Sequence, residues 1–340
     1  MTTFIGPVAN QGGPAIKNAI TLKYLGAQNI NIINTYGTSL QARIKSFLKT
    51  LFCQDDQILI GVSSKGRALL WPVISLKAAI HGGLSYGLIC IGGTIAEEAA
   101  ANARLISSMR GADIVAVETT GVKIKLADLD IVNNVVLFPN FVEDLNSASI
   151  PKANVCQSQT FRCVFLSSIR NKKGIKTMIA ACQAAIDSGC NMTLDIYGPI
   201  KADFDRHIFD GLFPGGTIVY KGVAQKDQVT AILSNYDCFV FPSEYEGEGF
   251  PSVLAEAMAV GLPVIASDIC YNKEIVGDNC GWVYRAGNQR ELKDLFISCA
   301  RNPSELKRIS AFNVQHARGW DARQVISTFS KQLTERGWSL

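Results

Sequence analysis

A strand, a glycine-containing loop and a helix follow one another between Phe239 and Gly261. Ser252 is the expected N-cap of the helix, since its hydroxyl can accept a first-turn N–H, and Gly261 is the expected C-terminal stop. A helix that begins after such a loop presents unpaired N–H groups and the positive end of its dipole. The segment therefore predicts a binding site for a phosphate or diphosphate.

Two glutamates lie on either side of this expected phosphate site. Glu256 lies four residues past Ser252, which is about one helical turn or ~6 Å along the axis. The ribose of a bound nucleotide would lie there, and a carboxylate can accept hydrogen bonds from both of its hydroxyls. Glu248 lies in the loop before the helix, toward the sugar. The pair predicts a nucleotide-sugar site; for either glutamate alone, a solvated position is the alternative.

The spacing of Glu248 and Glu256, within Glu-Gly-Phe-Pro and Glu-Ala-Met-Ala-x-Gly-x-Pro-Val, resembles family 4 of the retaining glycosyltransferases, which have the GT-B fold. The resemblance implies that Glu256 binds the nucleotide ribose and that Glu248 acts next to the donor sugar. It also implies that the backbone after Glu248 contacts the sugar and the phosphates. The residues that would do so are Gly249, Phe250, Val253 and Leu254.

A lysine-glycine pair follows an expected strand in the segment Ser168-Ile-Arg-Asn-Lys-Lys-Gly174. The family carries an arginine here and, five residues later, a Lys-Gly pair. The resemblance therefore assigns Lys173 a catalytic role, in which it neutralises the charge of the donor diphosphate. The arginine position holds Ser168, and Arg170 is its candidate replacement. A solvated lysine at a helix start is the alternative interpretation of Lys173.

Glycines at two other places extend the resemblance. Gly222 follows an expected strand and resembles the family's strand-end glycine near the nucleotide base. Gly12 and Gly13 follow the first expected strand and open a helix. GT-B enzymes place such a loop against the donor phosphates and the acceptor. An ordinary turn is the alternative for these two glycines.

Short apolar, β-branched runs alternate with helix-period segments along the chain, which is typical of parallel sheets covered by helices on both faces. A polar, helix-poor stretch after Phe138 predicts a linker. We therefore expect an N-terminal, acceptor-side domain over 1–150 and a nucleotide-sugar-binding domain over 151–319, with a helix in 320–340 that packs back on the first. The fold class is α/β. The resemblance implies a GT-B fold of two Rossmann-like, doubly wound domains that face a central cleft.

Helix-period patterns in the first half cover Ala15–Leu25, Ser39–Phe52 and Ala96–Met109. The second of these is apolar on one face and carries basic residues, among them Lys45 and Lys49. Such a helix can lie on an anionic membrane, or it can pack on a sheet with a solvated face. Packing on the sheet is the favoured interpretation.

The bulk composition limits the partners. With 33 Lys and Arg against 29 Asp and Glu, the net charge is +4, which is too balanced for a nucleic-acid-binding protein. The 10 cysteines include no C-x-x-C pair and are expected to be free thiols in a reducing compartment. No apolar run approaches the roughly 20 residues that span a bilayer. We expect a cytoplasmic protein whose membrane contact is peripheral, on the inner face of the cell membrane.

Neither a metal site nor a cofactor is predicted. The 3 histidines have no metal-ligand spacing. Asp128-Leu-Asp130 and Asp203-Phe-Asp205 match the Asp-x-Asp pattern of metal-dependent glycosyltransferases, but both lie away from the glycine loops. The helix dipole and Lys173 can supply the positive charge instead.

The predicted function is retaining, metal-independent transfer of a hexose from a nucleoside-diphosphate sugar, with UDP-sugar favoured. By family analogy the acceptor is a glycan or lipid-linked glycan in surface polysaccharide synthesis. A nucleotide-sugar 2-epimerase and a non-catalytic nucleotide-sugar-binding partner subunit are the alternatives, the latter because of Ser168.

Overall fold

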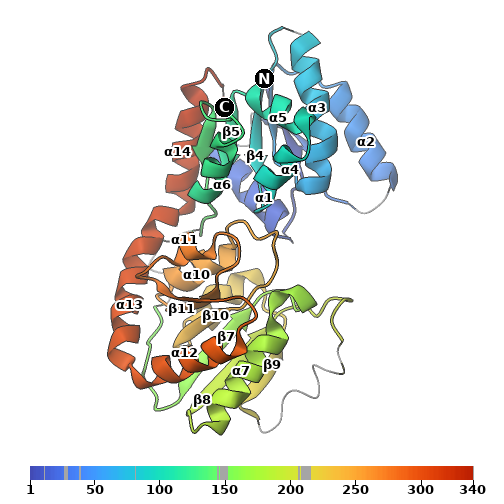
Figure 1. Ribbon diagram of the computed structural model, residues 1–340. Helices are drawn as coiled ribbons and strands as arrows, with labels where there is room; N and C mark the ends of the chain where they lie inside the picture. Colours follow the sequence, from blue (N-terminus) through green and yellow to red (C-terminus); the bar gives the residue numbers. More distant parts are fainter. Residues whose placement is uncertain are drawn as a thin grey trace. The chain divides into compact units, whose positions relative to one another are not determined.

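The computed structural model describes the chain except for residues 11, 27–29, 38–39, 81, 144, 146–151, 206, 208–215 and 340. The chain forms two compact units (Figure 1). The N-terminal unit contains Met1–Glu143 together with Ala322–Leu340, and the C-terminal unit contains Asp144–Asp321. Among the described residues, no helix combines the length and the apolar character needed to cross a membrane.

The N-terminal unit is built on a six-stranded parallel sheet with the order β2-β1-β3-β4-β5-β6. Its central strands are buried on both faces, which explains their continuous apolar sequences. The strands are β1 (Thr2–Gly6), β2 (Ile30–Asn34), β3 (Gln57–Ile60), β4 (Ser85–Cys90), β5 (Ile114–Val117) and β6 (Val135–Leu137). The helices are α1 (Gly13–Leu25), α2 (Leu40–Leu51), α3 (Ser64–Ile80), α4 (Ile95–Ala100), α5 (Ala103–Arg110), α6 (Thr120–Ala127) and α14 (Ala322–Thr334).

The last helix of the chain, α14, completes the core of the N-terminal unit. It contacts α1, and the Phe329 ring stacks on Phe138 with 4.4 Å between the ring centroids. Trp338 is buried and its indole N–H donates to Asp113 Oδ2 at 3.1 Å. The red helix in Figure 1 therefore belongs to the same unit as the blue strands.

The C-terminal unit contains a second six-stranded parallel sheet with the order β12-β11-β10-β7-β8-β9. The strands are β7 (Phe161–Leu166), β8 (Met192–Tyr197), β9 (Ile218–Gly222), β10 (Cys238–Phe241), β11 (Val264–Ser267) and β12 (Gly281–Tyr284). The α-helices are α7 (Ile175–Asp187), α9 (Val229–Leu233), α10 (Ser252–Ala259), α11 (Asn272–Val276), α12 (Gln289–Arg301) and α13 (Pro303–His316). Short 3₁₀ helices span Asn171–Lys173, Lys226–Gln228 and Ala317–Trp320.

Each sheet has one point where the strand order reverses. In the N-terminal sheet this point lies between β1 and β3, and in the C-terminal sheet it lies between β7 and β10. The loops that leave two such strands diverge to opposite faces of the sheet, which opens a crevice at the carboxyl ends of the strands. Most of the predicted site residues lie in the loops after β1, β7 and β10 or in the helices that these loops lead into, whereas Gly222 ends β9. The topology therefore favours these loops for ligand binding.

The helix expected over Ala96–Met109 is two helices, so that prediction was wrong. The chain leaves the first helix at Ala101, and Asn102 caps the second one, with its Oδ1 accepting the N–H of Arg104 at 3.0 Å. Asparagine competes for backbone N–H groups in this way and favours a cap over a helix interior. The apolar period continues across the break and therefore hides it.

Candidate functional site

Lys173 and Glu248 form an ion pair at the switch point of the C-terminal sheet. Glu248 is buried, and the Ser243 hydroxyl also donates to its Oε1 at 2.7 Å. The Lys173 ammonium lies 5.4 Å from the centre of the Phe241 ring and 5.8 Å from that of Tyr245. The lysine is therefore held by a carboxylate and by two aromatic faces, which restricts its position.

The loop after β7 reaches the end of β10 because residue 174 is glycine. Gly174 has a left-handed φ of 65°, and a Cβ added there would lie 1.8 Å from the carbonyl oxygen of Pro242. The N–H of Glu244 also donates to the Lys172 carbonyl at 2.9 Å. A side chain at position 174 would separate the two loops and remove Lys173 from Glu248.

The loop that carries Glu248 is also anchored to the end of β11. The Ser267 hydroxyl donates to the Ser243 carbonyl, and the Asn272 amide donates to the Ser267 carbonyl at 3.0 Å. Ser243, Ser267 and Asn272 are all fully buried. Buried hydrogen bonds of this kind fix a loop in one conformation.

Ser252 is the first residue of α10, and Pro251 takes the N-cap position, so the prediction of a Ser252 cap was wrong. Proline has no side-chain oxygen, and within the described ranges no side-chain hydrogen bond caps this helix. The first N–H groups of a helix have no acceptor within it. The N–H of Leu254 already donates to the Pro251 carbonyl at 3.0 Å, so among the described residues the amides of Ser252 and Val253, with the dipole behind them, are the ones available to an anion.

Phe250, just before α10, has a side chain with a packing role. Its ring meets Trp320 edge to face, with 5.0 Å between the centroids, and Trp320 meets His316 in the same way at 4.9 Å. These contacts fix the loop end from the side of α13. The contact with a ligand that was predicted for Phe250 would therefore come from its backbone.

Glu256 has different surroundings from Glu248. Its side chain is half-buried, and burial raises the pKa of the Glu256 carboxyl to about 7, while the charge of Lys226 opposes this rise. In the described part of the chain, no hydrogen bond to its carboxylate oxygens is found. Half-buried carboxylates with raised pKa values and unused acceptors are typical of binding sites.

The other predicted residues of the C-terminal unit lie on neighbouring loops. Arg170 is half-exposed, and its Nε lies 3.9 Å from Asp203 Oδ1. Ser168 is partly buried in the loop after β7. Gly222 ends β9 with a φ of 85°, and its carbonyl accepts the N–H of Gly198 at 2.8 Å. The structure thus joins Lys173 with Glu248, whereas Arg170 pairs with a different carboxylate.

In the N-terminal unit, Gly12 and Gly13 form the turn between β1 and α1. Gly12 has a φ of 84°, and its carbonyl accepts the N–H of Ile16 at 3.0 Å. Both glycines are exposed. The turn lies at the switch point of its sheet, and the first amides of α1 face outward from it without a side-chain cap.

A buried ion pair lies under the loops at the same edge of the N-terminal sheet, and the sequence analysis missed it. Lys17 donates to Glu118 Oε1 at 2.8 Å and to the Phe138 carbonyl at 3.0 Å, and Gly92 donates its N–H to Glu118 Oε2 at 3.0 Å. Burial lowers the pKa of the Lys17 ammonium, while the Glu118 carboxylate favours its charged form. The position of Glu118 directly after a buried strand was the available signal.

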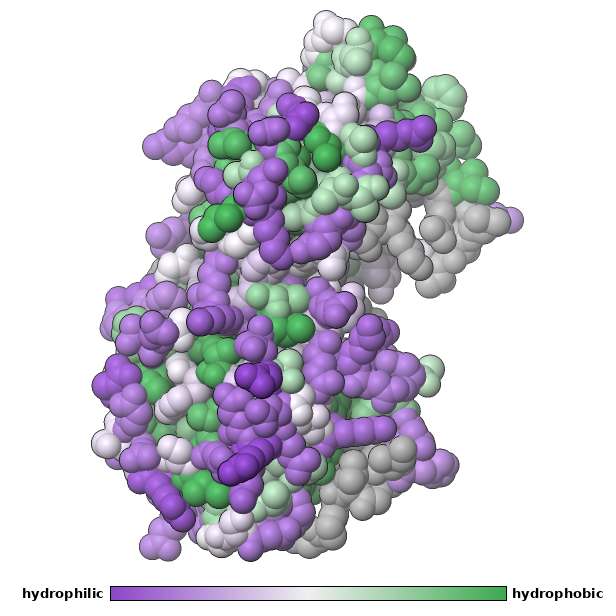
Figure 2. Space-filling view, viewed as in Figure 1, coloured by the Kyte–Doolittle hydropathy of each residue, from purple (hydrophilic) through white to green (hydrophobic). Residues whose placement is uncertain are grey.

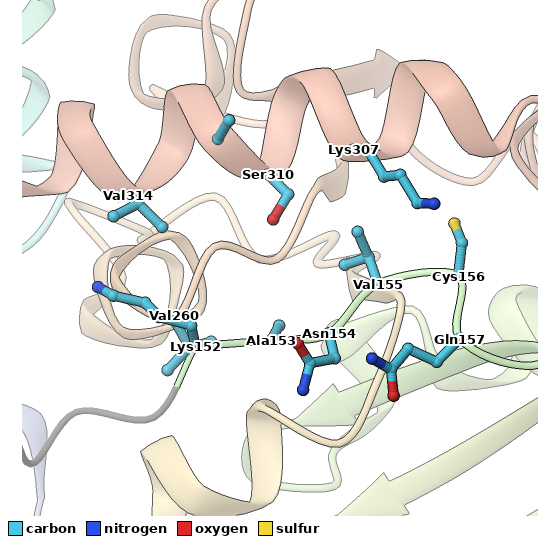
Figure 3. A pocket seen from close by; sticks show the side chains of 11 residues that line it. Lys152, Ala153, Asn154, Val155, Cys156, Gln157, Val260, Lys307, Ser310 and Val314 are labelled. Carbon is cyan, nitrogen blue, oxygen red and sulfur yellow. The ribbon is translucent and has the colours of Figure 1, made fainter.

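A cavity of about 360 Å³ lies elsewhere in the C-terminal unit. Figure 3 shows Asn154 and Gln157, from the segment before β7, opposite Ser310 and Lys307 of α13. None of the predicted donor-site residues lines this cavity. Within the described ranges, no group of His, Cys, Asp and Glu side chains is arranged to hold a metal ion.

Residues 147–315 match the family model of the glycosyl transferases group 1. The matched region contains every predicted site residue of the C-terminal unit. The chain is 28% identical over 155 residues to the amylovoran biosynthesis glycosyltransferase AmsK of Erwinia amylovora, an alignment that covers 44% of this chain and 38% of that protein. The chain thus spans less than half the length of this relative.

Solved structures of low sequence identity share the whole architecture. Anabaena HepE in complex with UDP has a TM-score of 0.75 at 14% identity, with 98% of this chain and 100% of that chain covered. The lipopolysaccharide outer core galactosyltransferase WaaB has a TM-score of 0.71 at 13% identity, with 98% and 99% covered. The two Rossmann-like units therefore have the GT-B fold, which confirms the predicted fold class.

Proposed function

We propose that this protein is a retaining, metal-independent glycosyltransferase that uses a nucleoside-diphosphate sugar. The observation that carries the proposal is the Lys173–Glu248 pair at the switch point of a group 1 glycosyl transferase domain, with the uncapped start of α10 following in the same loop. A cation, a helix N-terminus and two carboxylates in different surroundings supply complementary contacts for phosphate, sugar and ribose.

In the proposed reaction the bond from the anomeric carbon to the diphosphate oxygen breaks, the acceptor oxygen bonds to that carbon on the same face, and the acceptor hydroxyl proton passes to the leaving diphosphate. Negative charge develops on the leaving diphosphate, and positive charge develops on the sugar ring. Lys173 and the first amides of α10 stabilise the negative charge on the diphosphate. Removal of one such donor typically lowers the rate by about 10²–10³-fold. The Glu248 carboxylate holds Lys173 in place and accepts a hydrogen bond from a hydroxyl group of the donor sugar.

Glu256 has the properties that a ribose ligand needs. Its carboxylate is half-buried, and no hydrogen bond within the described protein uses its oxygens. A vicinal diol offers two donors to one carboxylate. These donors favour the ionised form of Glu256, so nucleotide binding and deprotonation are coupled in this proposal.

We favour a UDP-sugar donor and an acceptor of the glycan or lipid-linked glycan class. HepE, which shares the fold, binds UDP in its solved complex, and AmsK is named as a glycosyltransferase of amylovoran biosynthesis. The loop at Gly12 and Gly13 is proposed to contact the donor phosphates from the N-terminal unit. Neither a cofactor nor a metal is part of the proposal.

Thermal unfolding with UDP, GDP, ADP and dTDP tests the donor site. A nucleotide at 100 times its Kd stabilises the native state by about 2.7 kcal/mol. We expect one nucleotide, UDP, to raise the Tm of the wild type and to lose this effect in Glu256→Ala. Absence of a shift with all four nucleotides at millimolar concentration would overturn the donor site.

Transfer is then measured with UDP-sugars in the presence and absence of an acceptor glycan. Release of UDP that depends on acceptor supports the transferase. A 2-epimerase would isomerise the sugar without acceptor. A non-catalytic binding subunit would bind the nucleotide and leave the sugar unchanged. Ser168, which replaces the family's arginine, is the residue that supports this alternative.

A further inference from the structure

Helices α2 and α3 of the N-terminal unit expose apolar side chains to solvent on adjoining faces. On α2 and just after it these are Ile44, Leu48, Leu51 and Phe52, with Phe52 77% exposed. On α3 they are Leu69, Leu76 and Ile80, the last two 62% and 67% exposed. Figure 2 shows the apolar atoms gathered over these helices. We call the seven residues the α2–α3 face.

The two helices are fixed against each other where α2 ends. The Lys77 ammonium of α3 donates to the carbonyls of Cys53 and Leu51, the latter at 3.4 Å. Each helix presents its apolar residues at the spacing of one helical face. A cluster of exposed apolar side chains on a folded unit is typical of an interaction surface. The earlier interpretation, that α2 packs with a solvated outer face, therefore accounts for only part of this helix.

The two helices that carry the α2–α3 face contain basic residues and no acidic ones. Neither Leu40–Leu51 nor Ser64–Ile80 contains an aspartate or a glutamate. Lys45 and Lys49 line a shallow groove of about 560 Å³ with Ile44, Leu48 and Phe52. Among the described residues, neither lysine has an ion-pair partner.

Two acidic residues, Asp55 and Asp56, follow Phe52 beyond the end of α2, and Asp55 is already engaged within the unit. Asp55 accepts hydrogen bonds from Asn31 at 3.0 Å and from the Thr3 hydroxyl, so its carboxylate is engaged at the edge of the sheet. These two hydrogen bonds hold the pKa of the Asp55 carboxyl below its usual range.

We propose that the α2–α3 face docks on the surface of a membrane that contains anionic lipids. Exposed apolar side chains enter the boundary between headgroups and acyl chains, while flanking lysines contact the anionic headgroups. The α2 helix would lie in the plane of the membrane. A second copy of the chain is a poorer partner, because a symmetric contact would bring Lys45 and Lys49 of both copies together. This inference does not depend on the glycosyltransferase activity.

Co-sedimentation of the full chain with vesicles tests the proposal. We expect binding to vesicles of phosphatidylcholine with phosphatidylglycerol, little binding to phosphatidylcholine alone, and a marked loss at high salt, where the Debye length shortens. Lys45→Ala with Lys49→Ala should weaken the partition coefficient by about 30-fold, since each lysine near an anionic surface contributes about fivefold. Phe52→Ser should weaken it by about tenfold or more.

Helix α6 of the same unit offers matched controls. Lys123 and Lys125 are exposed there, as is Ile124. Lys123→Ala with Lys125→Ala makes the same change in net charge, and Ile124→Ser removes an exposed apolar side chain; both should bind like the wild type. Equal losses in the control and test variants, or equal binding to both kinds of vesicle, would overturn the proposal. So would a wild-type dimer in sedimentation velocity that Phe52→Ser converts to a monomer.

Discussion

Lys173 and Glu248 form an ion pair although they are 75 positions apart and follow different strands. The pair exists because β7 and β10 are neighbours at the switch point, where their loops leave the sheet. A pair built in this place can exchange its internal contact for a ligand: a diphosphate can approach Lys173 while a sugar hydroxyl approaches Glu248.

Lys173→Ala should lower the rate of transfer by about 10²–10³-fold, because it removes a cation from the leaving diphosphate. It also leaves Glu248 buried without its partner, which should cost on the order of 3 kcal/mol of unfolding free energy. Steady-state kinetics and urea unfolding measure the two effects. Lys172→Ala is the control, since Lys172 is exposed and adjacent; similar losses in both variants would contradict the role of Lys173.

Gly174→Ala should destabilise the protein more than Gly189→Ala does. Both glycines have a left-handed φ, 65° and 84°, but an added Cβ meets the Pro242 carbonyl at position 174 and no atom within 4 Å at position 189. The backbone conformation alone costs about 1–2 kcal/mol in each variant. Only Gly174→Ala also forces the two loops apart. Urea unfolding of both variants gives the difference, and equal losses would show that the loops separate without cost.

The predicted parts of the site are those carried by short stretches of sequence. Glu248 and Glu256 lie eight positions apart in one loop–helix segment, and Lys173 with Gly174 is a local pair after a strand. The alternation of apolar runs and helical segments was likewise sufficient to predict the α/β class. Such features depend on neighbours in sequence, which a single chain displays directly.

The missed parts depend on strand order, which no local pattern determines. Lys17 and Glu118 are 101 positions apart: Lys17 lies in α1 and Glu118 directly follows β5, so their contact depends on where the fold places α1 relative to β5. Ser243 lies in the segment between Phe239 and Gly261 that predicted the site, yet its hydrogen bond to Glu248 depends on the conformation of the turn between them. Lys226, whose charge opposes the rise in the pKa of Glu256, follows a third strand, β9.

Lys17→Met should destabilise the N-terminal unit by about 3–5 kcal/mol, because it leaves Glu118 buried and uncompensated. Lys17→Met with Glu118→Leu should recover most of this loss, since no lone charge remains. Lys23→Met, on the same helix, removes an ammonium that is 61% exposed and pairs with Glu143. Lys23→Met should therefore lower the unfolding free energy by only about 0–1 kcal/mol. Urea unfolding compares the three, and a double variant as unstable as Lys17→Met would refute the explanation.

Nucleotide affinity should rise with pH through about 7, the value to which burial raises the pKa of Glu256. The ribose hydroxyls donate to the ionised carboxylate, so below this pH the group must first lose a proton, and Kd should increase by up to about tenfold per pH unit. Isothermal titration with UDP between acidic and alkaline pH measures this. Glu256→Gln should bind more weakly and show a flat profile, whereas Glu246→Gln, in the exposed part of the loop, should behave like the wild type.

The stability of the ligand-free protein should show the opposite trend. The Glu256 carboxyl titrates at about 7 in the native state against an ordinary value of 4.5, so between these values the native state binds more protons than the unfolded chain. The unfolding free energy therefore falls as pH rises through this window, and the loss is complete above it. Glu256→Gln carries no charge to bury and should exceed the wild type in urea unfolding at alkaline pH, with the difference vanishing below 4.5. A Glu256→Gln variant that is less stable than the wild type at alkaline pH would mean that the ionised carboxylate already has a stabilising partner, and the ribose assignment would lose its basis.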